Sequence, residues 1–282
     1  MPVKLIALDI DGTLLDSRFQ LPEPNRKAVV EAASRGIEVA LVTGRRFDFA
    51  LPIAQEFDCP LTLIVNNGAV VKSKDGITHL RHLLPRDVAR QVLEATPKFR
   101  RGTAAVFDRP LQNQVIYEFV DWDDPQQKGY LARNLDYIAQ VSPLMDALTE
   151  DPIQVMFMGK VEPMRGAEAL LRSLPFAHRY ALAVTVYKNR DFSMIDVIHP
   201  ACSKGAALEE WVALRGLRRE QVMAIGDNHN DREMLTYAGI PIVMGNCVEE
   251  LKTLGWRQTL SNDDCGVAAA IEEYAFGGSG CD

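Results

Sequence analysis

Two acidic segments, far apart in the sequence, carry side chains whose types and spacing suit one reactive site. The first, residues 9–13 (DIDGT), directly follows an apolar run. Since residues two apart in an extended chain point the same way, Asp9 and Asp11 can reach one site at the carboxyl end of a strand, the edge where open α/β sheets bind ligands. Gly12 permits a sharp turn there, and Thr13 can hydrogen-bond near an anion. A strand followed by a plain acidic turn is the alternative for this segment alone.

The second acidic segment, residues 226–231 (GDNHND), also follows an apolar run, 222–225. It adds the Asp227 and Asp231 carboxylates at the same kind of strand end. Carboxylates gathered at one place repel one another and raise their own pKa values, and a hard divalent cation that prefers oxygen ligands, such as Mg²⁺, relieves that repulsion. Because phosphoryl chemistry uses such a cation to neutralise oxygen charge, the two segments together predict a magnesium site for phosphoryl groups.

Two weaker signals fit the same chemistry. Residues 43–45 (TGR) stand at the end of another predicted strand, where the Thr43 hydroxyl and exposed amides entering a helix can cradle an anion. Lys204 stands at the start of a predicted helix, after Ser203, where its ammonium can hold a phosphate oxygen. Taken singly, a strand-end Thr-Gly is usually a plain turn and a helix-start lysine is usually solvated, so the order and strand-end placement of all four signals carry the interpretation.

A parallel sheet would hold these segments, and the first and last thirds of the chain have the pattern of one. Short apolar runs that alternate with helical periodicity indicate parallel strands covered by helices on both faces. Gly36 is placed to end the first helix and Ser203 to cap the one that begins at Lys204. The predicted strands are 4–9, 38–42, 62–66, 222–225 and 240–244, and the predicted helices are 25–35, 49–57, 204–215, 231–238, 248–254 and 267–274.

The middle of the chain predicts a second α/β domain inserted into the first. We expect a Rossmann-like parallel-sheet core of residues 1–83 and 190–282, and an inserted domain at 84–189. The glycine-rich tail, residues 277–280, is expected to be disordered. The predicted strands of the middle are 103–107, 115–120, 153–158, 180–187 and 192–198, and its predicted helices are 86–96, 128–139 and 163–174.

Composition argues against several classes of protein. The 282 residues are 47% hydrophobic and 24% charged with a formal net charge of −7, which is typical of a soluble globular protein and lacks the basic stripe of nucleic-acid binders. No run of about 18 apolar residues indicates a membrane span. The N-terminal apolar run is broken by Asp9 and Asp11 and is too short for a signal peptide. Five scattered cysteines without a CxxC pair favour reduced thiols and a cytoplasmic location.

The four signals together resemble the haloacid dehalogenase-like superfamily and, within it, the Cof-type sugar-phosphate phosphatases. That family carries a DxDGT motif, a Thr or Ser at a second strand end, a lysine and a GDxxND motif in this order, and all four occur here without substitution. Segments 66–69 (NNGA), 244–246 (MGN) and 261–264 (SNDD) also resemble Cof-type segments. The resemblance covers residues 1–83 and 190–282, while the insertion matches the family's α/β cap in position and size only.

The resemblance implies a magnesium-dependent phosphatase that forms an aspartyl-phosphate. Asp9 would be the nucleophile, and Asp11 would protonate the leaving alkoxide and then deprotonate the hydrolytic water. The cap would close over a small phosphorylated metabolite, with sugar phosphates as the favoured class. Magnesium would be held by Asp9, the Asp11 backbone carbonyl and Asp227, with Asp231 as a further carboxylate or one outside the direct ligands, and phosphate by Thr43, Lys204, Asn230 and the Gly44 and Ile10 amides.

Other interpretations stay open at this point. A phosphomutase would use the same aspartyl-phosphate but return the phosphoryl group to another hydroxyl, and a phospho-accepting receiver or regulatory module would also gather carboxylates and magnesium at strand ends. Cys202 could be a thiolate nucleophile, but the carboxylate interpretation accounts for more residues. His229 is expected to be an exposed loop residue, and Arg45 to anchor its loop rather than contact phosphate. The substrate and the oligomeric state stay open.

Overall fold

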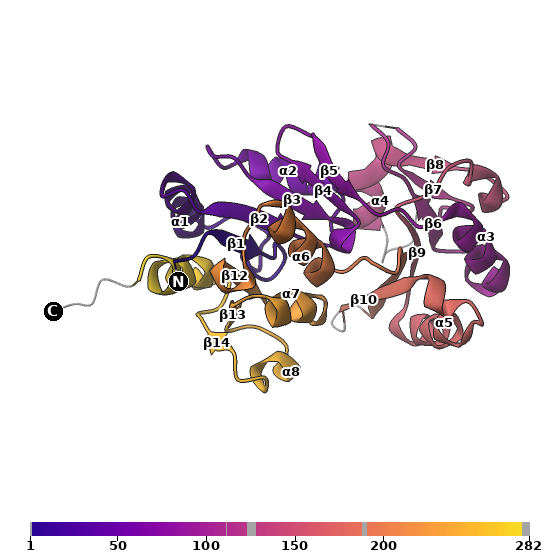
Figure 1. Cartoon of the computed structure of the whole chain (residues 1–282). Helices are drawn as coiled ribbons and strands as arrows, with labels where there is room; N and C mark the ends of the chain where they lie inside the picture. The colour runs from indigo at the N-terminus through magenta and orange to yellow at the C-terminus, as the bar shows by residue number, and fades with distance from the viewer. Residues whose placement is uncertain (1, 111, 123–127, 188–190, 278–282) are drawn as a thin grey trace. The chain divides into compact units, whose positions relative to one another are not determined.

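The structure, a computed structural model, consists of two compact units (Figure 1). Unit 1 combines Met1–Arg81 with Ser203–Asp282, and unit 2 is the continuous segment His82–Cys202. The expected disordered tail lies, from residue 278 onward, outside the described residues. Those are residues 2–110, 112–122, 128–187 and 191–277.

Unit 1 is built on a sheet that has eight strands among the described residues. In spatial order they are β14 (Arg257–Gln258), β13 (Ile240–Val243), β12 (Val222–Gly226), β1 (Leu5–Leu8), β2 (Glu38–Val42), β3 (Thr62–Val65), β4 (Val70–Ser73) and β5 (Thr78–Arg81). From β14 to β3 all pairings are parallel, and β4 and β5 continue the sheet as antiparallel strands. The predicted α/β fold with a parallel-sheet core is therefore confirmed.

Strand β1 lies at the point where the sheet changes its direction of winding. It pairs in parallel with β12 on one side and β2 on the other, so Leu8 is opposite both Ile225 and Leu41. The chain runs from β1 through β2 to β3 in one direction, and later adds β12 and β13 in the opposite direction. Open α/β sheets bind ligands at such a point, outside the carboxyl ends of the strands. Both acidic segments begin there.

Packing on β1 and a side-chain cap place the helix that carries Lys204. Leu5–Leu8 are fully buried, as a parallel strand covered on both faces requires, and Leu5 shares a hydrophobic cluster with Leu208. Ser203 Oγ accepts a hydrogen bond from the Ala206 N–H at 3.0 Å, which confirms the predicted N-cap. The helices of unit 1 are α1 (Glu23–Ser34), α2 (Phe47–Gln55), α6 (Lys204–Leu214), α7 (Arg232–Tyr237), α8 (Glu249–Lys252) and α9 (Gly266–Ala270).

Unit 2 has its own sheet and core. Its strands, in spatial order, are β10 (Ala181–Tyr187), β11 (Phe192–Ile198), β9 (Gln154–Gly159), β6 (Thr103–Val106), β7 (Val115–Tyr117) and β8 (Ile138–Gln140). All described pairings are antiparallel except β7 with β8. Phe157 and Ile195 share one buried cluster with residues of two helices. The helices of unit 2 are α3 (Arg86–Ala95) and α5 (Val161–Ser173), which join that cluster, and α4 (Lys128–Asn134).

The boundaries of the units differ from the predicted domain boundaries. Residues 190–202 were expected in the core, yet β11 pairs with β9 and β10, and the chain re-enters unit 1 only at Ser203. An apolar strand pattern does not state which sheet the strand joins, because partners are chosen by long-range packing. The antiparallel strands β4 and β5 were not predicted, and the predicted helix 128–139 ends at Asn134.

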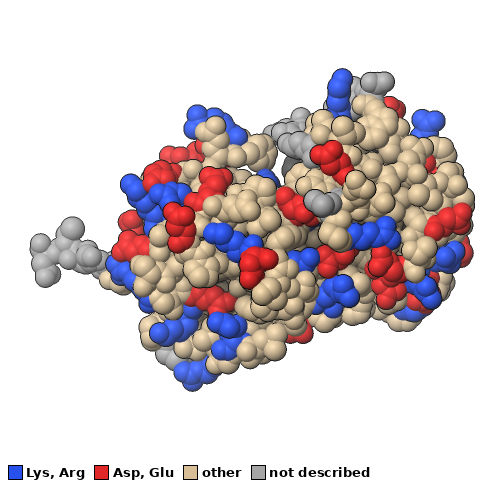
Figure 2. Space-filling model, turned by 90° about the horizontal axis from the view of Figure 1, so that it is seen from above, with Lys and Arg blue, Asp and Glu red and all other residues tan. Residues whose placement is uncertain are grey.

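Two further features concern helix length and surface charge. No helix among the described residues is long and apolar enough to cross a membrane. On the face shown in Figure 2, acidic and basic side chains are interspersed rather than segregated.

Gly205, beside Lys204, is predicted to be essential for the close approach of α6 to α7. A Cβ on Gly205 would lie 2.7 Å from the backbone carbonyl carbon of Glu233, so Gly205→Ala should destabilise unit 1 by about 1–3 kcal/mol through overpacking. The matched control is Gly166→Ala in α5, where a Cβ meets nothing within 4 Å and helix propensity should add up to ~1 kcal/mol. Urea unfolding of both variants measures the contrast, and a Gly205→Ala protein as stable as the parent would refute the close packing.

Candidate active site

The site is built where β1 and β12 end. The Asp9 N–H donates to the Ile225 carbonyl at 3.1 Å, so Asp9 extends the pairing of the two strands by one residue. Asp9, Asp227 and Asp231 are 5%, 8% and 0% exposed. One carboxylate oxygen from each of them lies within 4.8 Å of the others. The fold thus brings both acidic segments into one buried cluster.

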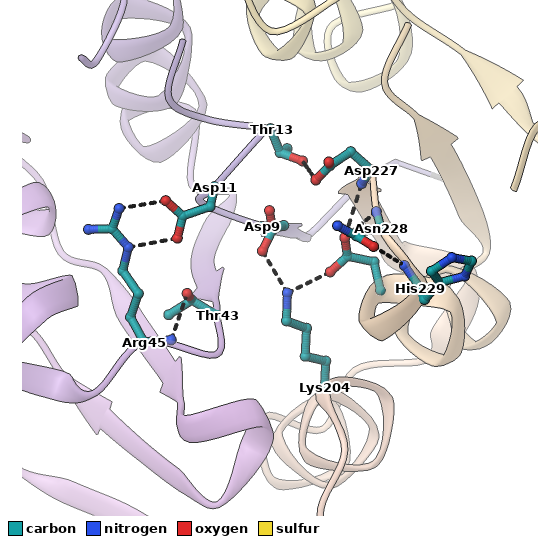
Figure 3. Close-up of polar contacts among 10 residues, drawn as sticks. Asp9, Asp11, Thr13, Thr43, Arg45, Lys204, Asp227, Asn228 and His229 are labelled. Atoms are coloured by element: carbon teal, nitrogen blue, oxygen red, sulfur yellow. Dashed lines mark hydrogen bonds and ion pairs between the residues drawn. The ribbon is translucent and has the colours of Figure 1, made fainter. Parts of the chain in front are cut away.

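Lys204 is hydrogen-bonded to two of these carboxylates. Its Nζ donates to Asp9 Oδ1 and to Asp231 Oδ1, both at 2.6 Å, and its side chain is 1% exposed (Figure 3). The other oxygen of Asp231, Oδ2, accepts the N–H groups of Asp227 and Asn228, both at 3.0 Å. Asp231 therefore fixes the shape of its own turn and the position of the lysine, while Lys204 places a positive charge against Asp9.

Thr13 and Gly12 position Asp227 from the opposite segment. Thr13 Oγ1 donates to Asp227 Oδ1 at 3.1 Å, a bond between residues 214 positions apart. Gly12 has φ = +86°, a conformation that glycine adopts at little cost, and a Cβ there would lie 2.5 Å from Asp227 Oδ2. The glycine of the first motif is thus needed for its backbone conformation and for the space that Asp227 occupies.

The charges of this cluster are unbalanced. Burial, and then repulsion from Asp231, raise the pKa of Asp9 well above its ordinary value. The same two causes raise the pKa of Asp227 to about 7. Burial opposes the charged form of Lys204, but the Asp231 and Asp9 carboxylates outweigh it and hold the pKa of Lys204 above its ordinary value. The cluster therefore contains three carboxylates but a single ammonium, that of Lys204.

This donor set fits a hard divalent cation. The three converging carboxylates offer only oxygen ligands, which suit Mg²⁺, and a dication would neutralise the charge that Lys204 leaves uncompensated. Asp9 and Asp227 are the predicted side-chain ligands; Asp9 accepts a hydrogen bond from the Lys204 ammonium and Asp227 accepts one from the Thr13 hydroxyl. Asp231 accepts three hydrogen bonds, which suits its prediction as a carboxylate outside the direct ligands. Coordination by the Asp11 backbone carbonyl stays a prediction.

The Asp11 carboxylate points toward another partner, Arg45 (Figure 3). Arg45 Nε donates to Asp11 Oδ2 at 2.7 Å and its terminal nitrogen donates to Oδ1 at 2.5 Å, the bidentate geometry of a strong arginine–carboxylate pair. The Asp11 side chain is 39% exposed, in contrast to the buried Asp9. Spacing alone predicted that Asp11 and Asp9 reach one site, and in this structure Asp11 lies outside the buried cluster. Arg45 thereby links the segment that precedes α2 to Asp11, and the expectation that it does not contact phosphate stays a prediction.

The Thr43–Arg45 turn is supported by a segment to which the sequence assigned no role. Thr43 Oγ1 accepts the Arg45 N–H at 3.1 Å. The Asn66 N–H donates to the Arg45 carbonyl at 2.9 Å, and the Asn67 N–H donates to the Thr43 carbonyl at 3.1 Å. A Cβ on Gly44 would meet Asn67 Oδ1 at 3.1 Å. The only signal that could have pointed to this support was the NNGA resemblance.

The remaining predicted residues occupy varied positions. Ile10 is fully buried, and its carbonyl accepts the Leu15 N–H at 3.0 Å. Asn230 is half-buried in the same turn as Asp231, and His229 is exposed as expected. Cys202 lies in unit 2, where its buried Sγ contacts the His82 carbonyl at 3.6 Å.

Comparisons with known proteins agree on one family. A profile of haloacid dehalogenase-like hydrolases matches residues 6–271. The chain is 29% identical over 289 residues to a protein named putative phosphatase YxeH from Bacillus subtilis, covering 97% of this chain and 98% of that protein. It is 30% identical over 293 residues to a protein named chloroplastic endoribonuclease YBEY from Arabidopsis thaliana, covering 96% of this chain but only 46% of that longer protein.

A solved structure shows the same fold. A haloacid dehalogenase-like hydrolase from Bacteroides thetaiotaomicron matches with a TM-score of 0.80 at 24% sequence identity, covering 96% of this chain and 99% of that one.

Magnesium is predicted to stabilise the protein more at high pH than at low pH. With the pKa of Asp227 raised to about 7 and that of Asp9 also raised, the folded protein binds protons that the unfolded chain, with aspartate pKa values near ~4, has released. These groups therefore lower the stability of the metal-free protein as pH rises from about 4 to about 7.

A bound cation reverses this loss of stability, but it must first displace the protons bound to Asp9 and Asp227. The gain in Tm on adding Mg²⁺ after EDTA treatment should therefore be larger at pH 8 than at pH 5. Asp227→Asn, the control, should lose most of that gain. Equal gains at both pH values would contradict the raised pKa values.

Proposed function

Because the chain belongs to the haloacid dehalogenase-like hydrolase family, as its motifs predicted, we propose that it is a magnesium-dependent phosphatase that acts through an aspartyl-phosphate on Asp9. Hydrolysis of phosphoric monoesters is the activity that this family and the phosphatase-named relative indicate. The observation that carries the mechanism is the buried Asp9 carboxylate, 2.6 Å from the Lys204 ammonium within a cluster of three carboxylates.

Asp9 is suited to attack phosphorus. An ionised Asp9 oxygen forms a bond to phosphorus in line with the ester oxygen, which leaves with the electron pair of the broken P–O bond. Lys204 favours the ionised form of Asp9 against the effect of burial. Bound Mg²⁺ supplies positive charge that neutralises the phosphoryl oxygens. Water then attacks the phosphorus of the acyl-phosphate, which releases phosphate and regenerates Asp9.

The phosphoryl oxygens need further donors. We assign this role to Thr43 and the Gly44 amide, to Lys204, and to Asn230 with the Ile10 amide. Donors aimed at the oxygens where charge develops stabilise the transition state without reorganisation. The support given to the Thr43–Arg45 turn by Asn66 and Asn67 keeps its donors in place.

Asp11 is suited to transfer protons to and from the substrate oxygens. In the first step a protonated Asp11 gives its proton to the leaving alkoxide, and in the second an ionised Asp11 takes a proton from water. In this structure both Asp11 carboxylate oxygens accept hydrogen bonds from Arg45, and accepting a proton is the role that Asp11 has in the second step. Donation in the first step requires that Asp11 leaves Arg45 and becomes protonated.

The substrate is proposed to be a small phosphate ester, with phosphosugars as the favoured class by family resemblance. Selection of the leaving group is assigned to unit 2, the family's cap. A phosphomutase would form an isomer instead of free phosphate, so the product discriminates the two. A receiver or regulatory module is less favoured, because relatives that match nearly the full length are named phosphatases. Endoribonuclease activity is not proposed for this chain, because the chain matches less than half of the Arabidopsis protein of that name.

Asp9→Asn should reduce steady-state phosphate release to the level of a protein-free blank. The fold should persist, because Lys204 keeps its bond to Asp231. Phosphate release from a panel of metabolite esters with Mg²⁺ measures the effect, and excess chelator should abolish turnover by the parent. Asp58→Asn, which changes an exposed carboxylate, should retain full activity. Hydrolysis by pure Asp9→Asn above the blank would remove Asp9 as the nucleophile.

Asp11→Asn should slow the hydrolysis of alkyl phosphates far more than that of activated aryl phosphates. Loss of the general acid should cost roughly 10²–10⁴-fold where the leaving alkoxide needs a proton, and much less where it leaves unaided. The measurement is kcat for a sugar phosphate and for p-nitrophenyl phosphate. Equal losses on the two substrates would count against an acid–base role for Asp11.

A further inference from the structure

Three asparagine side chains hold the backbone of the loop that follows Asp11. Their amide nitrogens donate to three of the four carbonyls of residues 12–15, and they come from three separate stretches of the sequence. The bonds run from Asn246 Nδ2 to Gly12 O at 2.8 Å, from Asn25 Nδ2 to Leu14 O at 3.0 Å and from Asn262 Nδ2 to Leu15 O at 2.9 Å.

Of the three, Asn246 holds the residue next to Asp11 and also belongs to a segment bonded to the second motif. Its Oδ1 accepts the Asn262 N–H at 2.9 Å, which fixes the direction in which its Nδ2 points. Two residues later, the Val248 N–H donates to the Asp227 carbonyl at 2.9 Å. The segment 246–248 therefore contacts both the loop after Asp11 and the turn that carries Asp227.

The contact from Asn246 is made with the backbone of Gly12, a residue whose own backbone rotates easily. A glycine at φ = +86° has the largest conformational freedom of any residue, and Gly12 joins Asp11 to Thr13. A bond to its carbonyl limits rotation of the peptide between Gly12 and Thr13. Because a catalytic group must be held within about 0.5 Å of its productive position by its supporting contacts, this limit bears directly on Asp11.

We propose that Asn246, oriented by Asn262, is a positioning residue that fixes the backbone beside Asp11 for proton transfer. The inference rests on the proposed function and deepens it, since it assigns a role to the MGN and SNDD segments. Asn25 and Asn262 are buried, so their loss would leave unpaired carbonyls in the interior and disturb the fold. Asn246 is exposed, so its role can be tested in a folded protein.

The experiment compares Asn246→Ala with the parent on a sugar phosphate and on p-nitrophenyl phosphate at saturating Mg²⁺. The expected result is a fall in kcat of about 10-fold or more on the sugar phosphate, the range typical of supporting contacts, with a change below about 3-fold on the aryl ester. Hydrogen exchange of the peptide covering residues 10–16 should also become faster. Asp264→Ala is the matched control, because it removes the carboxylate that accepts from the Ser261 hydroxyl in the same part of the chain without touching the loop.

The outcomes separate this inference from the proposed function. If the parent releases no phosphate from any ester, or if Asp9→Asn remains active, the proposed function fails. If the parent is active and Asn246→Ala matches it on both esters, or loses the same factor on both, Asn246 does not position Asp11. A loss that appears only as weaker Mg²⁺ affinity would place its effect on Asp227 and overturn the proposal as well.

Discussion

Burial of three carboxylates around one lysine ammonium is the constraint on which the rest of this structure depends. Asp9 and Asp231 each lie 2.6 Å from Lys204 Nζ, and Asp227 stands beside them and accepts a hydrogen bond from the Thr13 hydroxyl. Charges removed from water must be compensated or protonated, so the site needs either bound protons or further positive charge. The proposed affinity for a cation would therefore be a direct consequence of how the core is filled.

Two glycines satisfy this constraint, because each leaves space where a Cβ would collide with an aspartate of the cluster. A Cβ on Gly12 would strike Asp227, and a Cβ on Gly226 would lie 2.6 Å from the Asp231 Cβ. Gly12 thus allows the two turns to approach each other, and Gly226 allows Asp231 to pack against the start of its own turn. Parallel pairing of β1 with β12 provides the register, and side-chain amides attach the turns to the rest of unit 1.

Much of the site could be predicted from sequence because its signals are local. Apolar runs ending in acidic motifs located β1 and β12, and Ser203 marked the start of the helix that carries Lys204. The orientation of Asp11 could not be predicted, because the two-residue rule holds only for extended chain and the turn at Gly12 follows immediately. The sheet membership of β11 and the amide contacts of Asn246 depend on partners far away in the sequence, which a single sequence does not reveal.

The insertion of unit 2 also sets the order in which a ribosome delivers the parts of the site. Thr13 and Asp227 are 214 residues apart, which at about 5–20 residues per second corresponds to roughly 10–40 s of translation. Unit 2 is continuous and ends at Cys202, so its sheet can form while β1 still lacks β12 as a neighbour. A nascent chain therefore carries Asp9 before Lys204, Asp227 and Asp231 have been synthesised, and the proposed chemistry would begin only after the last third of the chain has been made.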